Sequence, residues 1–395
     1  MNRNTRRLRL AQACLAGVTL SALLVGSLPP LAYTKDLQQE YLTAWALRDG
    51  IDIFTPVSQL SARYFPAPTD TFPHPNPHPP VLALIGIPLT VLPFPAVVVL
   101  WLVFNVALLA AVGRWLGFSV PGSLALAAWP PLLSVLSIGQ FELLTLALAM
   151  LGWRAAAARR DWRAGLWLGC AAAIKMYPVF FLVPFAVRRR TRIVLAAGAV
   201  IIASQLGSLL VVGRPGLVRY YTEILPAVSN HYMHTVLNAA PYGAMLRLFG
   251  GASDVAPLIH APGVVLPLTL AFSLFACAAL VTLAPEAAPV AVLVALPAVW
   301  NYYVVLALPQ VVVLLRSHRA RLATLLAVSA ASFVVPLASF VLQMLSAFMR
   351  WGGSEAPPVA ALLMAVQPAG FLGLLLLSAA MGRRPQGYQD PVSLA

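Results

Sequence analysis

The chain has 395 residues, of which 60% are hydrophobic and 10% are charged, and its formal net charge at pH 7 is +14. Soluble globular domains carry about 25% charged residues, so this composition excludes a water-soluble enzyme, a disordered protein and a disulfide scaffold. All but two of the 26 basic residues are arginines, which stand singly or in short clusters between apolar stretches. That pattern is typical of loops beside anionic lipid headgroups and argues against a nucleic-acid partner. The composition predicts a polytopic membrane protein.

The N-terminal segment predicts the first membrane span and the orientation of the chain. The basic start MNRNTRRLRL is followed by an apolar run that exceeds the roughly 20 residues needed to cross a bilayer. No small-residue cleavage site follows, which favours an uncleaved span over a signal peptide. Arg3, Arg6, Arg7 and Arg9 hold the start in the cytoplasm, so residues 33–80 are expected outside.

Eleven further apolar runs give about twelve membrane helices, in one integral membrane domain over residues 1–395. With this placement, 18 Lys and Arg residues lie on the cytoplasmic side and 8 lie outside, as the positive-inside rule requires. Both termini are then cytoplasmic, with a tail over 382–395, and the main outer loops cover 33–94 and 213–261. The further spans are expected near 95–113, 121–138, 140–153, 164–174, 178–187, 192–212, 262–283, 287–299, 303–316, 322–345 and 357–381.

Two apolar segments are too short for straight spans. Residues 164–187 lie between two arginine clusters that both favour the cytoplasm, which predicts a hairpin with its tip at 175–178. Pro178 supplies the break in the helix. Residues 81–93 are predicted to form a helix that lies in the outer interface.

Acidic residues concentrate in the first outer loop, which holds five of the twelve. Asp36 follows the first span directly, and a helix expected to begin there carries Glu40 and Tyr41 on the same side, with Thr34 as a candidate N-cap. Two interpretations of Asp36 stay open at this point. It is either an acid solvated among headgroups near a helix N-terminus or a catalytic carboxylate.

Lys175 is one of only two lysines and lies inside an apolar run. A charge there is costly unless it is paired or meets a water-filled cavity. It either provides a point charge for the phosphate of an anionic substrate or extends its ammonium to the interface.

No pattern indicates a metal or a cofactor. His231 and His234 stand three residues apart without an evident third ligand, which favours an interfacial pair over a metal site. Asp49 and Asp52 do not form the D-x-D pair of nucleotide-sugar enzymes. A Walker loop, a GxGxxG loop, a nucleophile elbow and a CxxC pair are all absent from the sequence.

An ordered series of short motifs spans roughly residues 30–310. The early outer-loop Asp36 is followed by DGIDIFTP at 49–56, HPP at 78–80, IGQFE at 138–142, AAAIKMYP at 171–178, NAAPYGAMLRL at 238–248 and PAVWNYY at 297–303. In this order the chain resembles glycosyltransferase family 87, whose members are GT-C-fold mannosyl- and arabinofuranosyltransferases that use polyprenyl-phosphate sugars. The KMYP element is also similar to that of the eukaryotic GPI mannosyltransferase.

The resemblance implies a GT-C-like all-α fold with a long first outer loop, and roles for particular residues. Asp36 matches the acid that acts as general base on the acceptor hydroxyl, and Lys175 matches the lysine that approaches the donor phosphate, with Arg214 and Arg219 as candidate helpers. Gln140 matches the family's Gly-Gln element at the outer end of a span. The residues implied to contact substrate are Glu40, Tyr41, His78, Gln140, Glu142, Tyr177, Asn238, Tyr242, Trp300 and Asn301.

The sequence departs from the family pattern at four places. His78 stands where the family usually has Tyr, and Glu142 stands where Asn is common. Residues 239–240 are Ala-Ala instead of Gln-Ser, and residues 301–303 replace a His-rich pattern after Trp300. These changes lie around the sugar and acceptor pockets that the resemblance implies, so they bear on the choice of substrate.

The expected function is transfer of one sugar, mannose or arabinofuranose, from a polyprenyl-phosphate donor to a lipid or glycan acceptor. The reaction would be an inverting displacement at the outer face of the cytoplasmic membrane, without a metal or a cofactor. The alternative is a transporter or flippase, which should place its ionisable groups near the bilayer midplane. A third reading is an O-antigen ligase or polymerase, but those proteins carry their large outer loop late in the chain.

Overall fold

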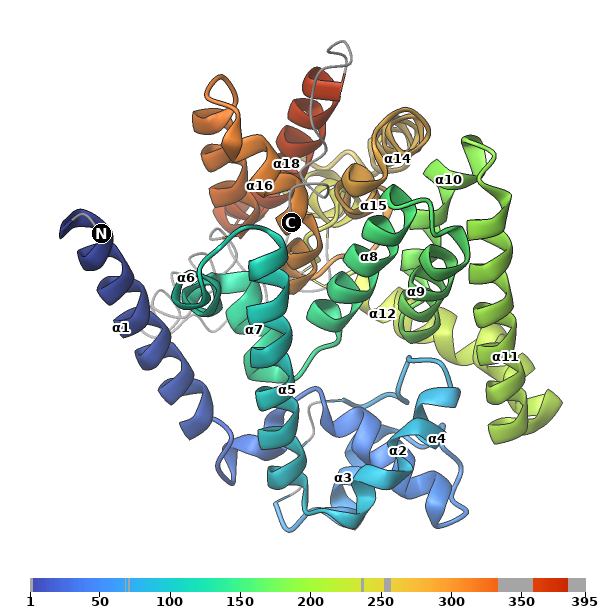
Figure 1. Cartoon of the computed structure of the whole chain (residues 1–395). Coiled ribbons are helices and arrows are strands. Elements are labelled where there is room, and N and C mark those ends of the chain that lie inside the picture. The colour runs from blue at the N-terminus through green and yellow to red at the C-terminus, as the bar shows by residue number, and fades with distance from the viewer. Residues whose placement is uncertain are drawn as a thin grey trace. The chain divides into compact units, whose positions relative to one another are not determined.

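The computed structural model describes residues 3–67, 69, 72–235, 238–251, 257–332 and 358–382 (Figure 1). Within these ranges the chain is helical and contains no β-strand, which confirms the all-α prediction. The chain divides into two compact units. The first comprises Met1–Val179 and Arg192–Val228, and the second comprises Phe180–Thr191 and Ser229–Leu394. The candidate site described below lies entirely in the first unit.

The first unit begins with α1 (Arg3–Val25), whose apolar side chains are largely exposed. Val18 and Leu10 are 70% and 65% exposed. A helix with leucine and valine outward on most sides is stable where lipid is the solvent. This supports the predicted first span.

The first outer loop folds into a helical layer around α2 (Gln38–Arg48). Helix α2 packs against α3 (Val57–Tyr64), α4 (Val81–Gly86) and the 3₁₀ turn η2 (Ile87–Val91). The helical segment expected at 81–93 is therefore present as α4 and η2. The N-cap prediction for Thr34 is wrong, because this residue belongs to the 3₁₀ turn η1 (Leu31–Thr34) and its hydroxyl donates to the Leu31 carbonyl.

The next helices bring the chain back toward this layer. They are α5 (Phe94–Trp115), α6 (Val120–Ala125), the 3₁₀ turn η3 (Leu126–Ala128), α7 (Pro130–Ile138), α8 (Glu142–Ala157) and α9 (Asp161–Ile174). The span expected at 121–138 is bent by 82° between Val120–Ala128 and Pro130–Ile138. The bend falls at Trp129, whose backbone is extended, and Pro130 and Pro131 begin the second helix because they lack the N–H that would continue the first. Helices α8 and α9 pack closely along their length, with Gly152 against the Leu168 side chain.

Helix α9 ends at Ile174, and the backbone of the next residue, Lys175, is extended, as the break expected at 175–178 requires. The 3₁₀ turn η4 (Tyr177–Leu182) and α10 (Val183–Val187) follow. The hairpin itself stays a prediction, since α9 and α10 belong to different units.

The segment after residue 212 differs from the loop that the sequence suggested. Helix α11 (Thr191–Arg219) continues past a kink at Gly213, where φ is +66°. A π-helical turn η5 (Tyr220–Ile224) and α12 (Leu225–Met233) extend it further. Gly213 adopts a backbone conformation that L side chains disfavour, so the chain changes direction there and resumes a helix. Arg214 and Arg219 are consequently helical residues.

The second unit packs α14 (Val265–Thr282) against α15 (Ala288–Ala295), and α15 against α18 (Pro358–Gly382). Helix α15 is shorter than the span expected at 287–299, because the backbone is extended at Leu296 and Trp300. Of the span expected at 322–345 and the tail at 382–395, residues 333–345 and 383–395 lie outside the described residues. The remaining elements are α13 (Pro241–Met245), η6 (Leu246–Gly250), η7 (Pro262–Val264), η8 (Pro285–Ala287), η9 (Asn301–Ala307), α16 (Leu308–Arg316) and a helix at Arg321–Ser332.

Four helices within the described ranges are long and apolar enough to cross a membrane, or five if the bent pair counts as one span. These are Thr5–Val25, Phe94–Trp115, Thr191–Met233 and Pro262–Thr282. With the apolar composition, they identify an integral membrane protein. Other predicted spans correspond to shorter apolar helices such as Tyr177–Val187 and Asn301–Arg316. The count of twelve spans stays a prediction.

Candidate active site

Gly139 lets two distant parts of the first unit meet. It ends α7 with a φ of +81°, and a Cβ built there would lie 2.8 Å from the Leu37 Cβ. The Leu37 amide donates to the Ile138 carbonyl at 3.2 Å. Only a residue without a side chain permits this approach. The contact places Asp36, just before α2, beside Gln140, just before α8.

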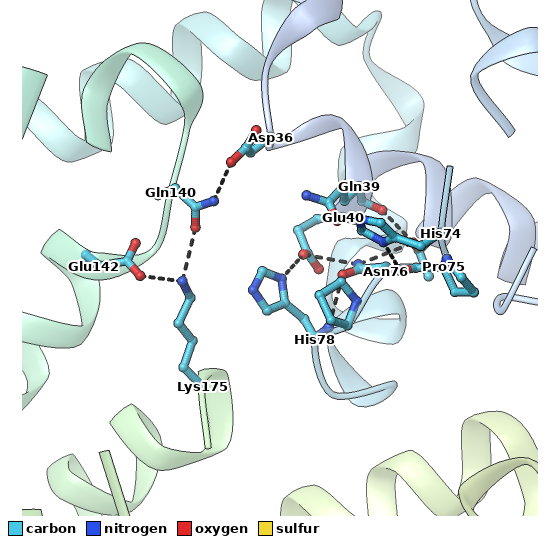
Figure 2. A network of polar contacts seen from close by, with 12 residues as sticks. Asp36, Gln39, Glu40, His74, Pro75, Asn76, His78, Gln140, Glu142 and Lys175 are labelled. Atoms are coloured by element: carbon cyan, nitrogen blue, oxygen red, sulfur yellow. Dashed lines mark hydrogen bonds and ion pairs between the residues drawn. The ribbon is translucent and has the colours of Figure 1, made fainter. Parts of the chain in front are cut away.

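The Asp36–Lys175 network consists of Asp36, Gln140, Lys175 and Glu142 (Figure 2). Gln140 Nε2 donates to Asp36 Oδ2 at 2.6 Å, and Lys175 Nζ donates to Gln140 Oε1 at 3.1 Å. Lys175 Nζ also forms an ion pair with Glu142 Oε1. The Gln140 amide therefore relays the position of the Lys175 ammonium to the Asp36 carboxylate, over 104 residues of sequence between Asp36 and Gln140.

Burial gives this network its electrostatic character. Lys175 is 5% exposed and Glu142 is fully buried, whereas Asp36 is half-buried. Burial raises the pKa of Asp36 from its ordinary value of 3.8 to about 6, against the lowering effects of the Gln140 hydrogen bond and the charges of Lys175 and His78. The Glu142 charge raises that pKa further. A carboxylate of this kind is unprotonated at neutral pH and more basic than an ordinary aspartate.

The Glu40–His78 cluster consists of Glu40, His78, Asn76 and Thr43. Glu40 Oε1 accepts from Asn76 Nδ2 at 3.1 Å and pairs with His78 Nδ1. Asn76 Nδ2 also reaches Thr43 Oγ1 at 3.3 Å, and the His78 backbone amide donates to Asn76 Oδ1 at 3.0 Å. These bonds fix the 72–80 segment on α2.

Phe141 connects the cluster with the network. It stands between Gln140 and Glu142 in the chain, and the His78 ring meets its ring edge-on with 5.6 Å between centroids. The charge of His78 also acts on Asp36. Figure 2 shows the His78 ring between Glu40 and the Asp36–Lys175 network. Six of the predicted site residues thus gather in one place: Asp36, Glu40, His78, Gln140, Glu142 and Lys175.

Other predicted residues of the first unit lie in different surroundings. The Tyr41 hydroxyl donates to the Leu92 carbonyl at 2.7 Å, and its ring packs against Phe65 and Phe94. Tyr177 is half-buried in the turn after Lys175. These tyrosines therefore contribute to the packing around the site.

The two predicted helper arginines are exposed on α11. Arg219 Nη1 donates to Asp52 at 2.8 Å, and Arg219 Nε lies 3.7 Å from Glu223. The guanidinium also lies 5.5 Å from the centre of the Phe54 ring. The described residues give Arg219 its own acidic partners and no bond to the Asp36–Lys175 network.

Asn238 is buried in the second unit, where its side chain hydrogen-bonds to backbone groups of neighbouring segments. Its Nδ2 donates to the carbonyls of Met233 and Pro297, at 2.9 and 2.8 Å. Its Oδ1 accepts from the amides of Ala240 and Val299, at 2.9 and 3.0 Å. Both donors and both lone pairs are thus engaged with backbone. In the structure, Asn238 therefore stabilises the backbone conformation around it.

The remaining predicted residues of the second unit take part in local contacts. Trp300 stacks on Tyr302 and meets Tyr232 edge-on, and the Tyr242 ring contacts His234. Asn301 Oδ1 accepts from Gln367 Nε2 at 3.0 Å.

Sequence reasoning missed Asn76, which donates to Glu40, and Thr43, which accepts from Asn76. The available signal was the HPNPHPP stretch, because an asparagine between prolines favours a side-chain turn onto the backbone two residues later. Among the described residues, no group of three or more His, Cys, Asp and Glu side chains could hold a metal ion.

The fold and the site define a helical membrane protein with a half-buried carboxylate, Asp36, hydrogen-bonded to a buried polar network. The model of glycosyltransferase family 87 matches residues 77–309, more than half of the chain. The chain therefore belongs to glycosyltransferase family 87, which confirms the resemblance seen in the sequence. The match includes Gln140 and Lys175 and begins after Asp36 and Glu40.

Two curated relatives carry the same name, polyprenol-phosphate-mannose-dependent alpha-(1-2)-phosphatidylinositol pentamannoside mannosyltransferase. The one from Mycolicibacterium smegmatis is 33% identical over 202 residues, which cover 48% of each chain. The one from Mycobacterium tuberculosis is 30% identical over 206 residues, which cover 49% of this chain and 47% of the relative. The chain thus spans about half the length of the curated relatives it matches. No solved structure matches.

Proposed function

We propose that the protein transfers mannose from a polyprenyl-phosphate donor to a glycolipid acceptor, with Asp36 as the general base. The observation that carries this proposal is the half-buried Asp36 carboxylate, held by Gln140 and with a pKa of about 6. Such a group takes up the proton of an acceptor hydroxyl as the hydroxyl attacks the anomeric carbon. General-base assistance of this kind is worth about 10²–10⁴-fold in rate.

The proposed donor follows from the relatives. Both are named for polyprenol-phosphate-mannose, which favours mannose over the arabinofuranose also expected from the sequence. Both are also named for a phosphatidylinositol mannoside, which favours a glycolipid acceptor. The displacement inverts the anomeric centre, since one attack opposite the departing phosphate needs no covalent intermediate.

Lys175 is proposed to stabilise the negative charge that develops on the departing phosphate. Preorganised charges of this type contribute about 3–4 kcal/mol each to transition-state stabilisation. The ion pair with Glu142 offsets part of the positive charge of Lys175. Lys175 also donates a hydrogen bond to Gln140, and through it Lys175 is proposed to position Asp36. Arg214 and Arg219 remain proposed helpers at the donor phosphate.

The other residues proposed to contact or shape the substrate pockets follow the family resemblance. Glu142, which pairs with Lys175, and Asn238, which bonds to backbone carbonyls, are proposed to shape the pockets from inside the protein. The full set is Glu40, Tyr41, His78, Gln140, Glu142, Tyr177, Asn238, Tyr242, Trp300 and Asn301.

We place the reaction at the outer face of the cytoplasmic membrane, with both termini in the cytoplasm. The arginine distribution supports this orientation, because basic loops stay inside. Outside-only labelling of Met176→Cys in intact cells tests the hairpin at 164–187. Labelling is expected, and its absence in a protein that labels after permeabilisation would contradict the hairpin.

The donor assignment is tested with a panel of radiolabelled polyprenyl-phosphate sugars in membranes that contain the protein. Label from the mannose donor is expected in a lipid-extractable product, with none from the arabinofuranose donor. Incorporation of arabinofuranose alone would overturn the choice of sugar while leaving the reaction class intact. In sealed vesicles of these membranes, movement of the labelled lipid to the other leaflet without a new glycosidic bond would indicate the transporter alternative.

A further inference from the structure

His78 has one ring nitrogen anchored and the other available. Nδ1 pairs with Glu40, and Nε2 makes no hydrogen bond to any described residue. The His78 side chain is 16% exposed, twice the 8% of Glu40 beside it. A histidine whose inner nitrogen is fixed by a carboxylate presents its outer nitrogen in a defined direction.

The orientation of the ring is fixed from several sides. Asn76 bonds both Glu40 Oε1 and the backbone amide of His78, so the acid and the histidine are held by one amide. The hydroxyl of Tyr220, in the π-helical turn η5, donates to the Pro77 carbonyl at 2.8 Å and so holds the 72–80 segment that carries His78. Phe141 supports the ring on another side. Figure 2 shows that the side of the ring opposite Glu40 is directed toward Lys175 and Gln140.

The acidic side chains around the His78 ring outnumber the lysine, so an incoming phosphate would need a second positive charge. Asp36, Glu40 and Glu142 are three acids, and Lys175 is the lysine among them. A phosphodiester brings one more negative charge. Because Glu142 already pairs with Lys175, part of the lysine charge is offset before a phosphate enters here. A protonated imidazole on the Glu40–His78 cluster supplies a further charge and a hydrogen-bond donor.

We propose that protonated His78 binds the donor phosphate through Nε2–H and stabilises that phosphate as it leaves, with Glu40 and Asn76 as positioning residues. The inference rests on the proposed function and adds a catalytic residue to it. In the step, the acceptor oxygen bonds to the anomeric carbon and its proton passes to Asp36. The bond between that carbon and the phosphate oxygen breaks, and its electron pair stays on the oxygen. His78 keeps its proton and shares it as a hydrogen bond.

Two substitutions separate this role from a purely structural one. His78→Asn preserves a donor at the position of Nδ1, facing Glu40, and removes the group at Nε2. His78→Gln extends a neutral donor toward the position of Nε2. The probe is binding of polyprenyl phosphate to the purified full-length protein, compared with polyprenol of the same chain length. The alcohol controls for tail binding.

The wild-type protein is expected to prefer the phosphate at least tenfold. His78→Asn should reduce that preference at least fivefold with polyprenol binding unchanged, and His78→Gln should fall between the two. A His78→Asn variant with the wild-type preference would overturn the inference and leave the proposed function standing. A wild-type protein that neither prefers the phosphate nor transfers sugar would overturn both.

A measurement on the wild-type protein covers the case in which the variants do not fold. Diethyl pyrocarbonate modifies an accessible imidazole nitrogen while that nitrogen is unprotonated, so a phosphate that covers Nε2 and keeps its proton in place blocks the reaction. Mass spectrometry quantifies the modification at each histidine. Polyprenyl phosphate should lower the modification of His78 at least threefold, and polyprenol should not lower it. The exposed His318 should be modified to the same extent with either lipid. Equal modification of His78 with either lipid would contradict the inference.

Discussion

Removing the charge of Asp36 is expected to abolish transfer without a loss of stability. The pKa of this carboxyl is about 6 in the folded protein against an ordinary value of 3.8. The unfolded chain therefore loses its proton at lower pH than the folded protein, and the folded state is destabilised as pH rises toward about 6. At about 1.4 kcal/mol for each pH unit, the full cost at neutral pH is about 3 kcal/mol. Screening at this half-buried side chain reduces it to about 2 kcal/mol.

Asp36→Asn removes that cost and keeps most of the geometry. The new amide oxygen still accepts from Gln140 Nε2, although a neutral hydrogen bond is weaker than a charge-assisted one by about 1 kcal/mol. The expected net gain at pH 7.5 is about 1 kcal/mol. For a chain of this length, that corresponds to a rise of about 1–2 °C in the apparent unfolding temperature.

The assay is thermal unfolding in detergent at pH 7.5 and at pH 5, beside sugar transfer by the same preparations. The stabilisation should shrink at pH 5, where the wild-type carboxyl is largely protonated. Asp52→Asn, in an exposed acid of the same loop, is the control and should change stability by less than about 0.5 kcal/mol. A fall of more than a few degrees for Asp36→Asn at pH 7.5 would refute the electrostatic reasoning.

Three further predictions concern the same network. Transfer should fall about tenfold for each pH unit below about 6, because protonation of Asp36 removes the base; initial rates that stay flat from pH 7.5 to 4.5 would exclude this assignment. Lys175→Met should cost about 3–5 kcal/mol by leaving Glu142 buried and unpaired, and adding Glu142→Leu should recover part of that loss; additive losses in thermal unfolding would show that the pair is not coupled. Gly139→Ala should cost about 1–3 kcal/mol and slow transfer, because its φ of +81° and the Leu37 contact leave no room for a methyl group. Gly17→Ala, which meets nothing within 4 Å, is its control in both assays.

The sequence could predict the helical membrane character and several of the residues that lie together at the candidate site. Composition alone indicated an all-helical membrane protein, and the ordered motifs indicated the family. The resemblance singled out Asp36, Gln140 and Lys175, which the structure joins by hydrogen bonds.

The meeting of distant segments could not be predicted from local patterns. Nothing near Asp36 indicates that Leu37 packs against Gly139, because the contact depends on a left-handed turn far along the chain. The Asn76 bond to Glu40 arises in the same way. The segment after Gly213 was expected to be a loop, but the chain resumes a helix beyond a single kink there. The helix before Leu296 is shorter than the expected span, because the backbone becomes extended at Leu296 although the composition stays apolar.

The role of Asp36 as general base is tested directly by sugar transfer in the wild-type protein and in Asp36→Asn. Membranes that contain either protein receive radiolabelled polyprenyl-phosphate mannose, and the label in the glycolipid fraction is measured at equal amounts of folded protein. If Asp36 is the general base, the wild type incorporates label and the variant loses at least about 100-fold of that activity. Near-normal transfer by Asp36→Asn would contradict the role of Asp36, and no transfer by the folded wild type would contradict the proposed function.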